Sequence, residues 1–238
     1  MNKNIFKFKQ FDIIQDTSVM KIGTDAVLLG AIADCSNCAN ILDIGTGTGI
    51  IALMLAQKSD SVIDCIDINP EAVKLTSENI KKSPWKNRLN VYHSSLQDFV
   101  PQYKYDLIIS NPPYFNTQII APDKNRAIAR HVIELSLKDL ALNVARLLKD
   151  NGIFYVIYPC EQAVDFTNNA QNVGLNAKQV YEIFSKTNSQ TPTRLITKYS
   201  KSKNQNESEP IKINIENENR HDYTKQYKQL TKDYYLKF

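Results

Sequence analysis

Short apolar runs alternate with longer helical segments through the middle of the chain. An apolar run at 41–44 leads through glycines into an apolar segment at 50–58, and a run at 62–67 precedes a segment of helical periodicity at 71–82. An Asn-Pro pair, typical of a helix start, stands before the second helical segment. Strands and helices that alternate over short loops build parallel sheets with right-handed crossovers. The pattern therefore predicts a doubly wound α/β fold.

The same alternation continues toward the C-terminus. Apolar positions at 133–149 recur at three- and four-residue steps, as in an amphipathic helix, and Asn-Gly at 151–152 is typical of a helix end. The further expected strands are 89–93, 105–110, 153–158, 179–183 and 194–199, and the further expected helices are 133–149, 161–173 and 223–236.

Segments outside this alternation form the flanks and loops. Residues 6–14 mix aromatic residues with lysines and predict a short strand or hairpin arm, which suits an edge strand and a nucleic-acid surface equally well. Residues 20–33 predict a short buried helix that Thr24 or Asp25 could cap. The polar stretch 115–130 follows a strand end, where a substrate gate would lie.

Composition is that of an ordinary globular protein. The 238 residues are 42% hydrophobic and include only seven glycines, which excludes collagen-like and disordered classes. The net charge of +4 favours polyanionic partners only weakly. Lysines interrupt the apolar residues at the N-terminus, and no run approaches the length of a membrane helix, so we expect a cytoplasmic protein without membrane contact.

The cysteines do not predict a metal site. Among the four cysteines, only Cys35 and Cys38 have the spacing of a metal or redox pair. A zinc ion would need two further ligands, and no second pair follows. We expect reduced thiols and no metal.

A candidate ligand site lies between the first regular strand and its helix. Gly45, Gly47 and Gly49 alternate after the acidic Asp43, and glycines let a backbone approach a ligand while a helix N-terminus offers amides. Asp67 ends the next strand, where its carboxylate can accept hydrogen bonds from a ribose diol. The glycine spacing departs from the nicotinamide dinucleotide pattern, which leaves the cofactor open.

A second candidate site is Asn111-Pro112-Pro113-Tyr114, where two prolines stop a buried strand. The Asn111 amide oxygen and the Pro112 carbonyl can accept the hydrogens of a planar nitrogen, while the Tyr114 ring stacks on the attached plane. A strand end with a double-proline stop is the plain structural explanation. The glycine turn upstream favours the functional one.

In combination, these motifs resemble the class I S-adenosylmethionine-dependent methyltransferases that act on amide or exocyclic amino nitrogens. The flanks at 6–11, 20–25 and 223–238 extend the resemblance to the bacterial tRNA adenine-N6 methyltransferases, which modify the adenine beside the anticodon of a valine tRNA. The resemblance implies a Rossmann-like seven-stranded sheet with helices on both faces and the last strand antiparallel. It also implies S-adenosyl-L-methionine as cofactor, tRNA as partner and no obligate protein partner.

The resemblance further implies one methyltransferase domain over 1–238. It comprises an N-terminal hairpin and helix extension at 1–39, a catalytic core at 40–200 and a C-terminal extension at 201–238. Asn111, Pro112 and Tyr114 would be catalytic, because hydrogen bonds from the adenine amine to Asn111 and Pro112 direct its lone pair at the methyl group. The implied cofactor contacts are Lys21, Thr24, Asp43, Gly45, Thr46, Gly47, Gly49, Asp67, Ile68, Ser95, Leu96 and Asn111.

Two groups of contacts stay open. Where the superfamily often has an acidic residue after the third strand, this chain has Ser95 and Leu96, with Asp98 shortly after, so the adenine contact is Ser95 and the Leu96 amide, or Asp98. The candidate phosphate contacts, each with a solvated surface charge as the alternative, are Lys7, Lys9, Arg126, Arg130 and the terminal lysines.

Other function classes remain as alternatives. A protein glutamine-N5 methyltransferase of the release-factor type could use the same Asn-Pro-Pro-Tyr corner, but its known members carry a helical N-terminal domain for which we expect no room. Other rRNA or DNA amino-group methyltransferases are conceivable, although a DNA enzyme needs a target-recognition segment of some size. A non-catalytic RNA-binding module predicts no cofactor binding, and the intact glycine turn argues against it.

Overall fold

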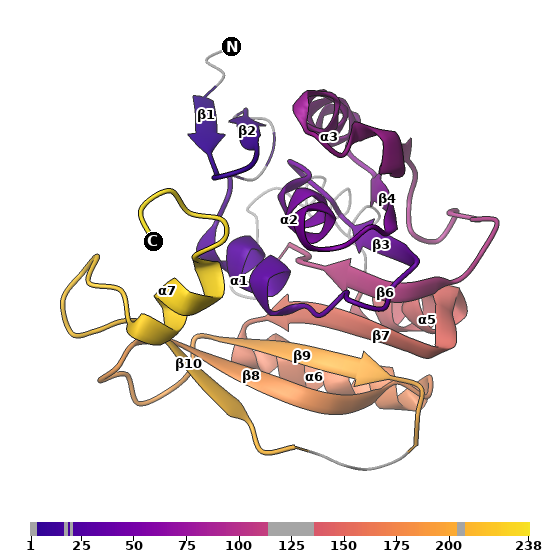
Figure 1. The fold of residues 1–238 in the computed structure, drawn as a ribbon. Coiled ribbons are helices and arrows are strands. Elements are labelled where there is room, and N and C mark those ends of the chain that lie inside the picture. The colour runs from indigo at the N-terminus through magenta and orange to yellow at the C-terminus, as the bar shows by residue number, and fades with distance from the viewer. Residues whose placement is uncertain (1–3, 17–18, 20, 114–135, 204–207) are drawn as a thin grey trace, which may run out of the picture.

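The computed structural model describes residues 4–16, 19, 21–113, 136–203 and 208–238. Among these residues, no helix is long and apolar enough to cross a bilayer. The elements are β1 (Asn4–Lys7), β2 (Asp12–Gln15), α1 (Thr24–Ile32), β3 (Asn40–Ile44), α2 (Ile50–Lys58), β4 (Val62–Asp67), α3 (Pro70–Lys82), a 3-10 turn (Lys86–Arg88), β5 (Leu89–His93), β6 (Tyr105–Ser110), α5 (Leu137–Leu147), β7 (Leu148–Tyr158), α6 (Cys160–Asn172), β8 (Asn176–Lys186), β9 (Arg194–Ser200), β10 (Ile211–Glu216) and α7 (Lys225–Thr231) (Figure 1).

The central sheet has the order β10-β8-β9-β7-β6-β3-β4-β5. All of its neighbours pair in parallel except β9, which lies antiparallel between β7 and β8. The expected doubly wound sheet is confirmed, and β3 to β9 supply its seven strands with the last one antiparallel. The sequence analysis missed β10, which adds an eighth strand by pairing in parallel with β8.

Helices cover both faces of the sheet, as expected. Figure 1 shows α1, α2 and α3 on one face and α5 and α6 on the other. Apolar residues of α1 and α2 pack with alternate residues of the strands in one core, and those of α5 and α6 form a second core on the opposite face. Seven of the nine residues of α2 are buried, which explains why its sequence is apolar on every side.

The predicted boundary between the helix at 133–149 and the strand at 153–158 is wrong. The helix expected at 133–149 is α5, which begins after Ser136, where the Ser136 hydroxyl caps the Asp139 amide, and ends at Leu147. Residues 133–135 lie outside the described part of the chain. The next residue, Leu148, is fully buried and pairs with Tyr105 of β6, so the chain enters β7 at once. Cross-strand pairing and burial of Leu148 therefore outweigh the helical periodicity, and the Asn-Gly pair lies within the strand.

Two smaller expectations also fail. Neither Thr24 nor Asp25 caps α1: the N-cap is Gly23, which makes no side-chain cap hydrogen bond.

The terminal helix α7 is shorter than the predicted 223–236. After Thr231 the amides of Tyr234 and Tyr235 both turn back to the Thr231 carbonyl, and Tyr234 is buried against the main core.

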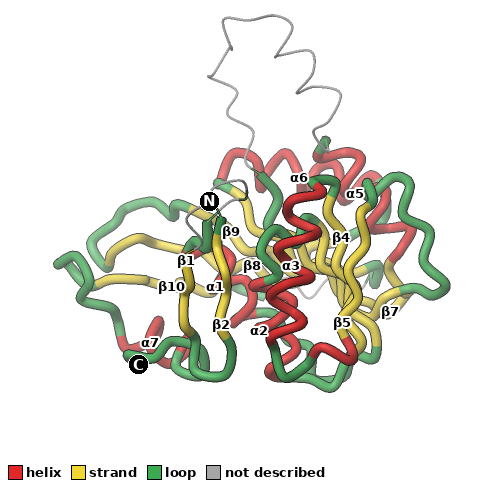
Figure 2. Tube along the Cα trace, turned by 90° about the horizontal axis from the view of Figure 1, so that it is seen from above, coloured by secondary structure: helices red, strands yellow, loops and turns green. Residues whose placement is uncertain are grey.

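The N-terminal hairpin is fastened at two places. Strands β1 and β2 pair antiparallel, and Figure 2 shows the hairpin between α3 and the side of the sheet that carries β10. The buried Asn79 side chain of α3 accepts from the Ile14 amide at 2.8 Å and donates to the Ile14 carbonyl at 3.1 Å. On the other side Phe8 forms a bridge with Tyr235, and their rings stack. The hairpin thus joins the core to the C-terminal segment.

Lys9 takes part in this junction. Its ammonium donates to the Lys232 carbonyl at 2.5 Å and to a main-chain oxygen of Phe238 at 2.6 Å. Lys7, two residues earlier at the end of β1, is exposed. The structure therefore gives Lys9 a stabilising role beside its predicted contact with phosphate.

The substitution Lys9→Met separates these roles. We expect it to lower the free energy of unfolding by about 1 kcal/mol, because two main-chain oxygens lose a charged donor while the aliphatic stem is kept. Urea denaturation of the whole protein measures the loss, and Lys7→Met is the matched control, expected to stay close to the parent protein. Equal stabilities of the two variants would show that the Lys9 contacts contribute nothing.

Candidate active site

The predicted site residues converge at the carboxyl edge of the sheet. Ile44 at the end of β3 pairs with Ile66 of β4 on one side and with Ser110 of β6 on the other. The Ser110 hydroxyl also donates to the Ile44 carbonyl at 3.0 Å. Strand order reverses between β3 and β6, which is the switch point where doubly wound sheets bind ligands. Gly45 and Asn111, the next residues along, leave the sheet as neighbours.

The glycine turn is shaped for close approach of a ligand. Gly45, Gly47 and Gly49 have φ values of +68°, +59° and +81°, a region that favours glycine. A Cβ atom at Gly45 would meet no atom within 4 Å, so the backbone there borders open space. Gly49 differs, because a Cβ atom there would lie 3.0 Å from the Thr76 methyl group. Gly45 therefore faces the ligand side, and Gly49 faces α3.

Four amides of the glycine turn are engaged within the protein. Gly45 and Thr46 both donate to the Ile66 carbonyl, at 2.9 and 3.1 Å, and Gly49 donates to the Thr46 carbonyl at 2.8 Å. The Gly47 amide donates to the Asp67 carboxylate at 2.9 Å. Pyrophosphate binding needs such amides to face the ligand. With these four engaged inside the protein, the turn suits a ligand that needs close backbone approach without anion recognition.

Asp43 lies buried beneath the turn. One carboxylate oxygen accepts from the Thr46 hydroxyl at 2.7 Å, and the other has no hydrogen-bond partner in the described structure. Burial, together with the nearby Asp67 carboxylate, raises the pKa of Asp43 to about 7, against the lowering effects of the Thr46 hydroxyl and the Ala52 amide. A buried acceptor without a partner, next to an open glycine, fits a ligand that carries a donor or a positive charge. S-adenosylmethionine carries both.

This carboxyl group predicts a pH effect on stability. Because the pKa is higher in the folded than in the unfolded chain, the folded state binds more protons, and stability is lost as pH rises from about 4 to about 7. The stability of the parent protein relative to Asp43→Asn should therefore fall across this window, by at most about 1.4 kcal/mol per pH unit. Urea denaturation at several pH values measures it, with Asp60→Asn on the surface as control. A difference that does not change with pH would contradict the raised pKa.

The residues predicted to contact the ribose and the adenine lie at the ends of β4 and β5. Asp67 accepts from the amides of Gly47 and Asn69, each at 2.9 Å, which fixes its carboxylate and leaves one acceptor position on each oxygen. Ile68 is half exposed beside it. The Ser94 amide donates to the Asp67 carbonyl at 3.1 Å and so draws the segment after β5 toward this site.

The structure clarifies the candidates for the adenine contact. The Ser95 hydroxyl donates to the Asp98 carboxylate at 2.6 Å and accepts from the Asp98 amide at 3.1 Å, so these two residues act as one closed turn. The Leu96 side chain is buried in the second core, and its carbonyl accepts from Arg146 at 3.1 Å. Leu96 can therefore offer a ligand only its backbone amide, while Asp98 is exposed.

The segment before α1 approaches the glycine turn. A Cβ atom at Gly47 would lie 3.8 Å from a methyl group of Val19, and the Ile22 amide donates to the Gln15 side chain at 2.9 Å. Lys21 and Thr24 are both exposed in this segment. Their predicted contacts with the cofactor stay predictions.

The substrate side begins at Asn111, which is partly buried, and Pro112, which is buried. Asp25 of α1 forms an ion pair with Arg194 of β9 at 3.1 Å, which ties the start of α1 to the strand beside β7. Tyr114, Arg126 and Arg130, together with the expected gate at 115–130, lie outside the described residues.

Sequence reasoning missed the residues that hold the turn in place. The Thr76 hydroxyl donates to the Gly47 carbonyl at 2.8 Å, and Asn79 donates to the Thr48 carbonyl at 2.9 Å as well as binding the hairpin. Both are fully buried on α3. Polar residues on the apolar side of an amphipathic helix were the available signal, because buried polar groups need partners.

The cysteine pair shows no feature of a reactive site. Burial raises the pKa of Cys35, and burial together with neighbouring negative groups raises the pKa of Cys38 to about 11. No group of three His, Cys, Asp or Glu side chains in the described structure could hold a metal ion.

A reversed sheet with one antiparallel strand, and a glycine turn that admits a ligand without offering its amides, define a class I methyltransferase domain. Residues 18–158 match the family model of the methyltransferase small domain. Solved structures agree on the fold: a predicted O-methyltransferase from Agrobacterium tumefaciens has a TM-score of 0.61 at 15% identity over 88% of this chain and 96% of that one. TYW2 of P. horikoshii in complex with MeSAdo has a TM-score of 0.60 at 14% identity over 84% and 72%.

Relatives with curated names are much more similar. The tRNA1(Val) (adenine(37)-N6)-methyltransferase of Parabacteroides distasonis is 41% identical over 98% of both chains, and that of Trichodesmium erythraeum is 41% identical over the full length of both. The chain belongs to the family of tRNA1(Val) (adenine(37)-N6)-methyltransferases. It is therefore a methyltransferase enzyme, and S-adenosylmethionine is its methyl donor.

Proposed function

We propose that this protein methylates N6 of adenine 37, beside the anticodon, in a valine tRNA, as the names of its relatives state for them. The observation that carries the proposal is full-length similarity at about 41% identity, including both flanks of the catalytic core. The position of Asn111 and Pro112 beside the glycine turn supports an amino nitrogen as acceptor.

Residues of the turn and of the β4 and β5 ends would hold the cofactor. Asp67 would accept the ribose hydroxyls, Gly45 would let the ligand approach, and the free oxygen of Asp43 would face its positively charged part. When bound, S-adenosylmethionine supplies an electrophilic methyl group attached to a sulfonium. The chain needs no strong base at this site, because the task that remains is to orient the acceptor.

Asn111 and Pro112 would perform that orientation. An exocyclic adenine amine is a poor nucleophile because its lone pair is delocalised into the ring. If the Asn111 side-chain oxygen and the Pro112 carbonyl accept its two hydrogens, the lone pair turns toward the methyl donor, and both oxygens stabilise the charge that develops on nitrogen. Tyr114 would stack on the base once it has left its neighbours.

The flanks would meet the rest of the tRNA. We assign the methyl transfer to residues 40–200 and RNA contacts to the extensions at 1–39 and 201–238. Lys7 is exposed on the hairpin, and Lys225, Lys228 and Lys237 are exposed on the C-terminal segment that the hairpin contacts. Exposed lysines of this kind neutralise phosphates and make the affinity depend on salt.

Labelled S-adenosylmethionine tests the proposal directly. The protein is incubated with a valine tRNA transcript, with the same transcript carrying guanine at position 37, and with a peptide-chain release factor, and the labelled product is mapped. We expect label only on the first, at N6 of adenine 37. Label on the release factor and not on RNA would replace the proposal with the glutamine methyltransferase, and label on the guanine transcript would reject the position.

A further inference from the structure

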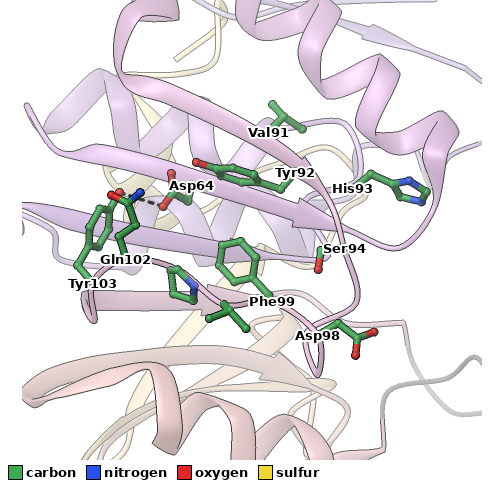
Figure 3. Close-up of a pocket in the computed structure, with 11 residues that line it drawn as sticks. Asp64, Val91, Tyr92, His93, Ser94, Asp98, Phe99, Gln102 and Tyr103 are labelled. Carbon is green, nitrogen blue, oxygen red and sulfur yellow. Dashed lines mark hydrogen bonds between the residues drawn. The ribbon is translucent and has the colours of Figure 1, made fainter.

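A cavity of about 690 Å³ lies at the edge of the sheet, away from the predicted path of methyl transfer (Figure 3). It is lined by residues of β4, β5 and the β5–β6 connection, residues 94–104. This connection contains no helix, whereas α5 and α6 cover the same face of the sheet over β7, β8 and β9. The cavity therefore exists because one end of this face has only a loop above it.

The floor of the cavity is the carboxylate of Asp64, which is 2% exposed. One of its oxygens accepts from the hydroxyls of Tyr105 at 2.7 Å and Tyr103 at 3.0 Å. The other accepts from the Asn90 side-chain amide at 2.9 Å. These donors are all neutral, and a carboxylate has room for about four hydrogen bonds. Tyr92 also hydrogen-bonds to Asp64 through its hydroxyl. The carboxylate is thus surrounded by neutral donors, and none of these donors carries a positive charge to match it.

The walls of the cavity are aromatic. Tyr92 on β5 and Tyr103 on the connection are 41% and 37% exposed, and both direct their hydroxyl ends toward Asp64 in Figure 3. The ring of Phe99 lies 5.5 Å from that of Tyr92. Burial, together with hydrogen bonding to Asp64, raises the pKa of Tyr103 to about 12, so its phenol remains a neutral donor. The rings therefore present π faces around a carboxylate.

The charge of the lining selects the ligand. The residues that line the cavity include Asp64 and Asp98 but neither Lys nor Arg, and His93 lies at the rim near the strand ends. Such a lining repels phosphate and does not suit an RNA backbone. Aromatic faces beside a carboxylate attract an organic cation, through cation–π contact and charge together. A nucleobase could stack there, but its phosphates would meet the acidic rim.

We propose that this cavity binds the primary ammonium group of an alkylamine, which lies between the exposed rings of Tyr92 and Tyr103, above the buried negative charge of Asp64. The ammonium could belong to a free polyamine or to a lysine side chain of another protein. The Asp64 end of the cavity is separate from the cofactor site, because Asp64 precedes the end of β4 by three residues, which is about 10 Å along a strand. It borders the cofactor site through Ser94 and Asp98, which line the cavity.

Calorimetry on the whole protein without RNA tests this proposal. The two probes are spermidine and Nα-acetyl-lysine N-methylamide, whose side-chain ammonium is free. We expect at least one of them to bind saturably at up to millimolar concentrations, and the probe that binds more tightly tells the two sources apart. Asp64→Asn keeps the shape of the floor but removes its charge, and Tyr92→Leu removes an exposed ring. Each should weaken the tighter probe by about tenfold. Val100→Ala, an exposed change in the same lining, should leave the affinity unchanged.

The two variants protect the test against misfolding. Because Asp64 is buried, a loss of binding in Asp64→Asn alone could come from a disturbed fold. Loss of binding in Tyr92→Leu as well, at a residue that is 41% exposed, shows that the cavity itself is the binding site. Absence of binding of either probe to the parent protein would overturn the proposal. Equal affinity in the parent and both variants would also overturn it, because the cation would then bind elsewhere. Methyl transfer is not read out, so the result is independent of the proposed function.

Discussion

Asn111→Ala is expected to lower the rate of methyl transfer by about 10²- to 10³-fold, the usual cost of removing one oriented hydrogen-bonding group from a developing charge. The side chain begins one residue after Ser110, whose pairing with Ile44 places it beside the glycine turn. Without the amide oxygen, one hydrogen of the substrate amine loses its acceptor, and the lone pair is no longer directed. Single-turnover kinetics with tRNA measures the loss.

Cofactor binding by this variant decides how the result is interpreted. We expect calorimetry to show nearly unchanged affinity for S-adenosylmethionine, because the main predicted contacts lie on the turn and on β4. Loss of cofactor binding together with activity would mean that Asn111 supports the fold of the site. Asn168→Ala, an exposed change on α6, is the matched control for the type of substitution and should retain full activity.

Gly49→Ala is expected to destabilise the protein by about 2 kcal/mol, which combines about 1 kcal/mol for a left-handed alanine with about 1 kcal/mol for crowding. Gly49 has φ +81° at the N-cap of α2, and its added Cβ atom would lie 3.0 Å from the Thr76 methyl group. Thermal unfolding should shift downward by about 6 °C for a chain of this size.

Two further variants separate the causes. Gly45→Ala has the same kind of backbone strain without a neighbour within 4 Å and should cost about 1 kcal/mol. Thr76→Ser removes the crowding methyl group but keeps the hydroxyl that donates to Gly47. A double-mutant cycle of Gly49→Ala with Thr76→Ser should give a coupling of about 1 kcal/mol. A coupling near zero would show that the turn relaxes away from α3.

Several helices and strands were predicted correctly because their hydrophobic periodicity agrees with the way they pack in the structure. The strands at 62–67, 89–93 and 105–110 and the helix at 50–58 have the predicted bounds. The helix at 133–149 does not, because Leu148 satisfies helical periodicity and strand burial alike, and only its partner Tyr105 decides between them. Strand β10 was missed although Ile211, Ile213 and Ile215 alternate with polar residues, because so short a strand at a sheet edge becomes recognisable only through its pairing with β8.

The sequence by itself determined the chemistry at the sheet edge: three glycines, two carboxylates and an Asn-Pro-Pro-Tyr corner, each at the end of a recognisable strand. Parallel pairing then had to bring those ends together. Only the tertiary structure decided how the groups are used, because hydrogen-bond partners come from other elements. It engages the amides of the turn with Ile66 and Asp67, buries Asp43, and leaves Asp64 beneath an uncovered end of the sheet.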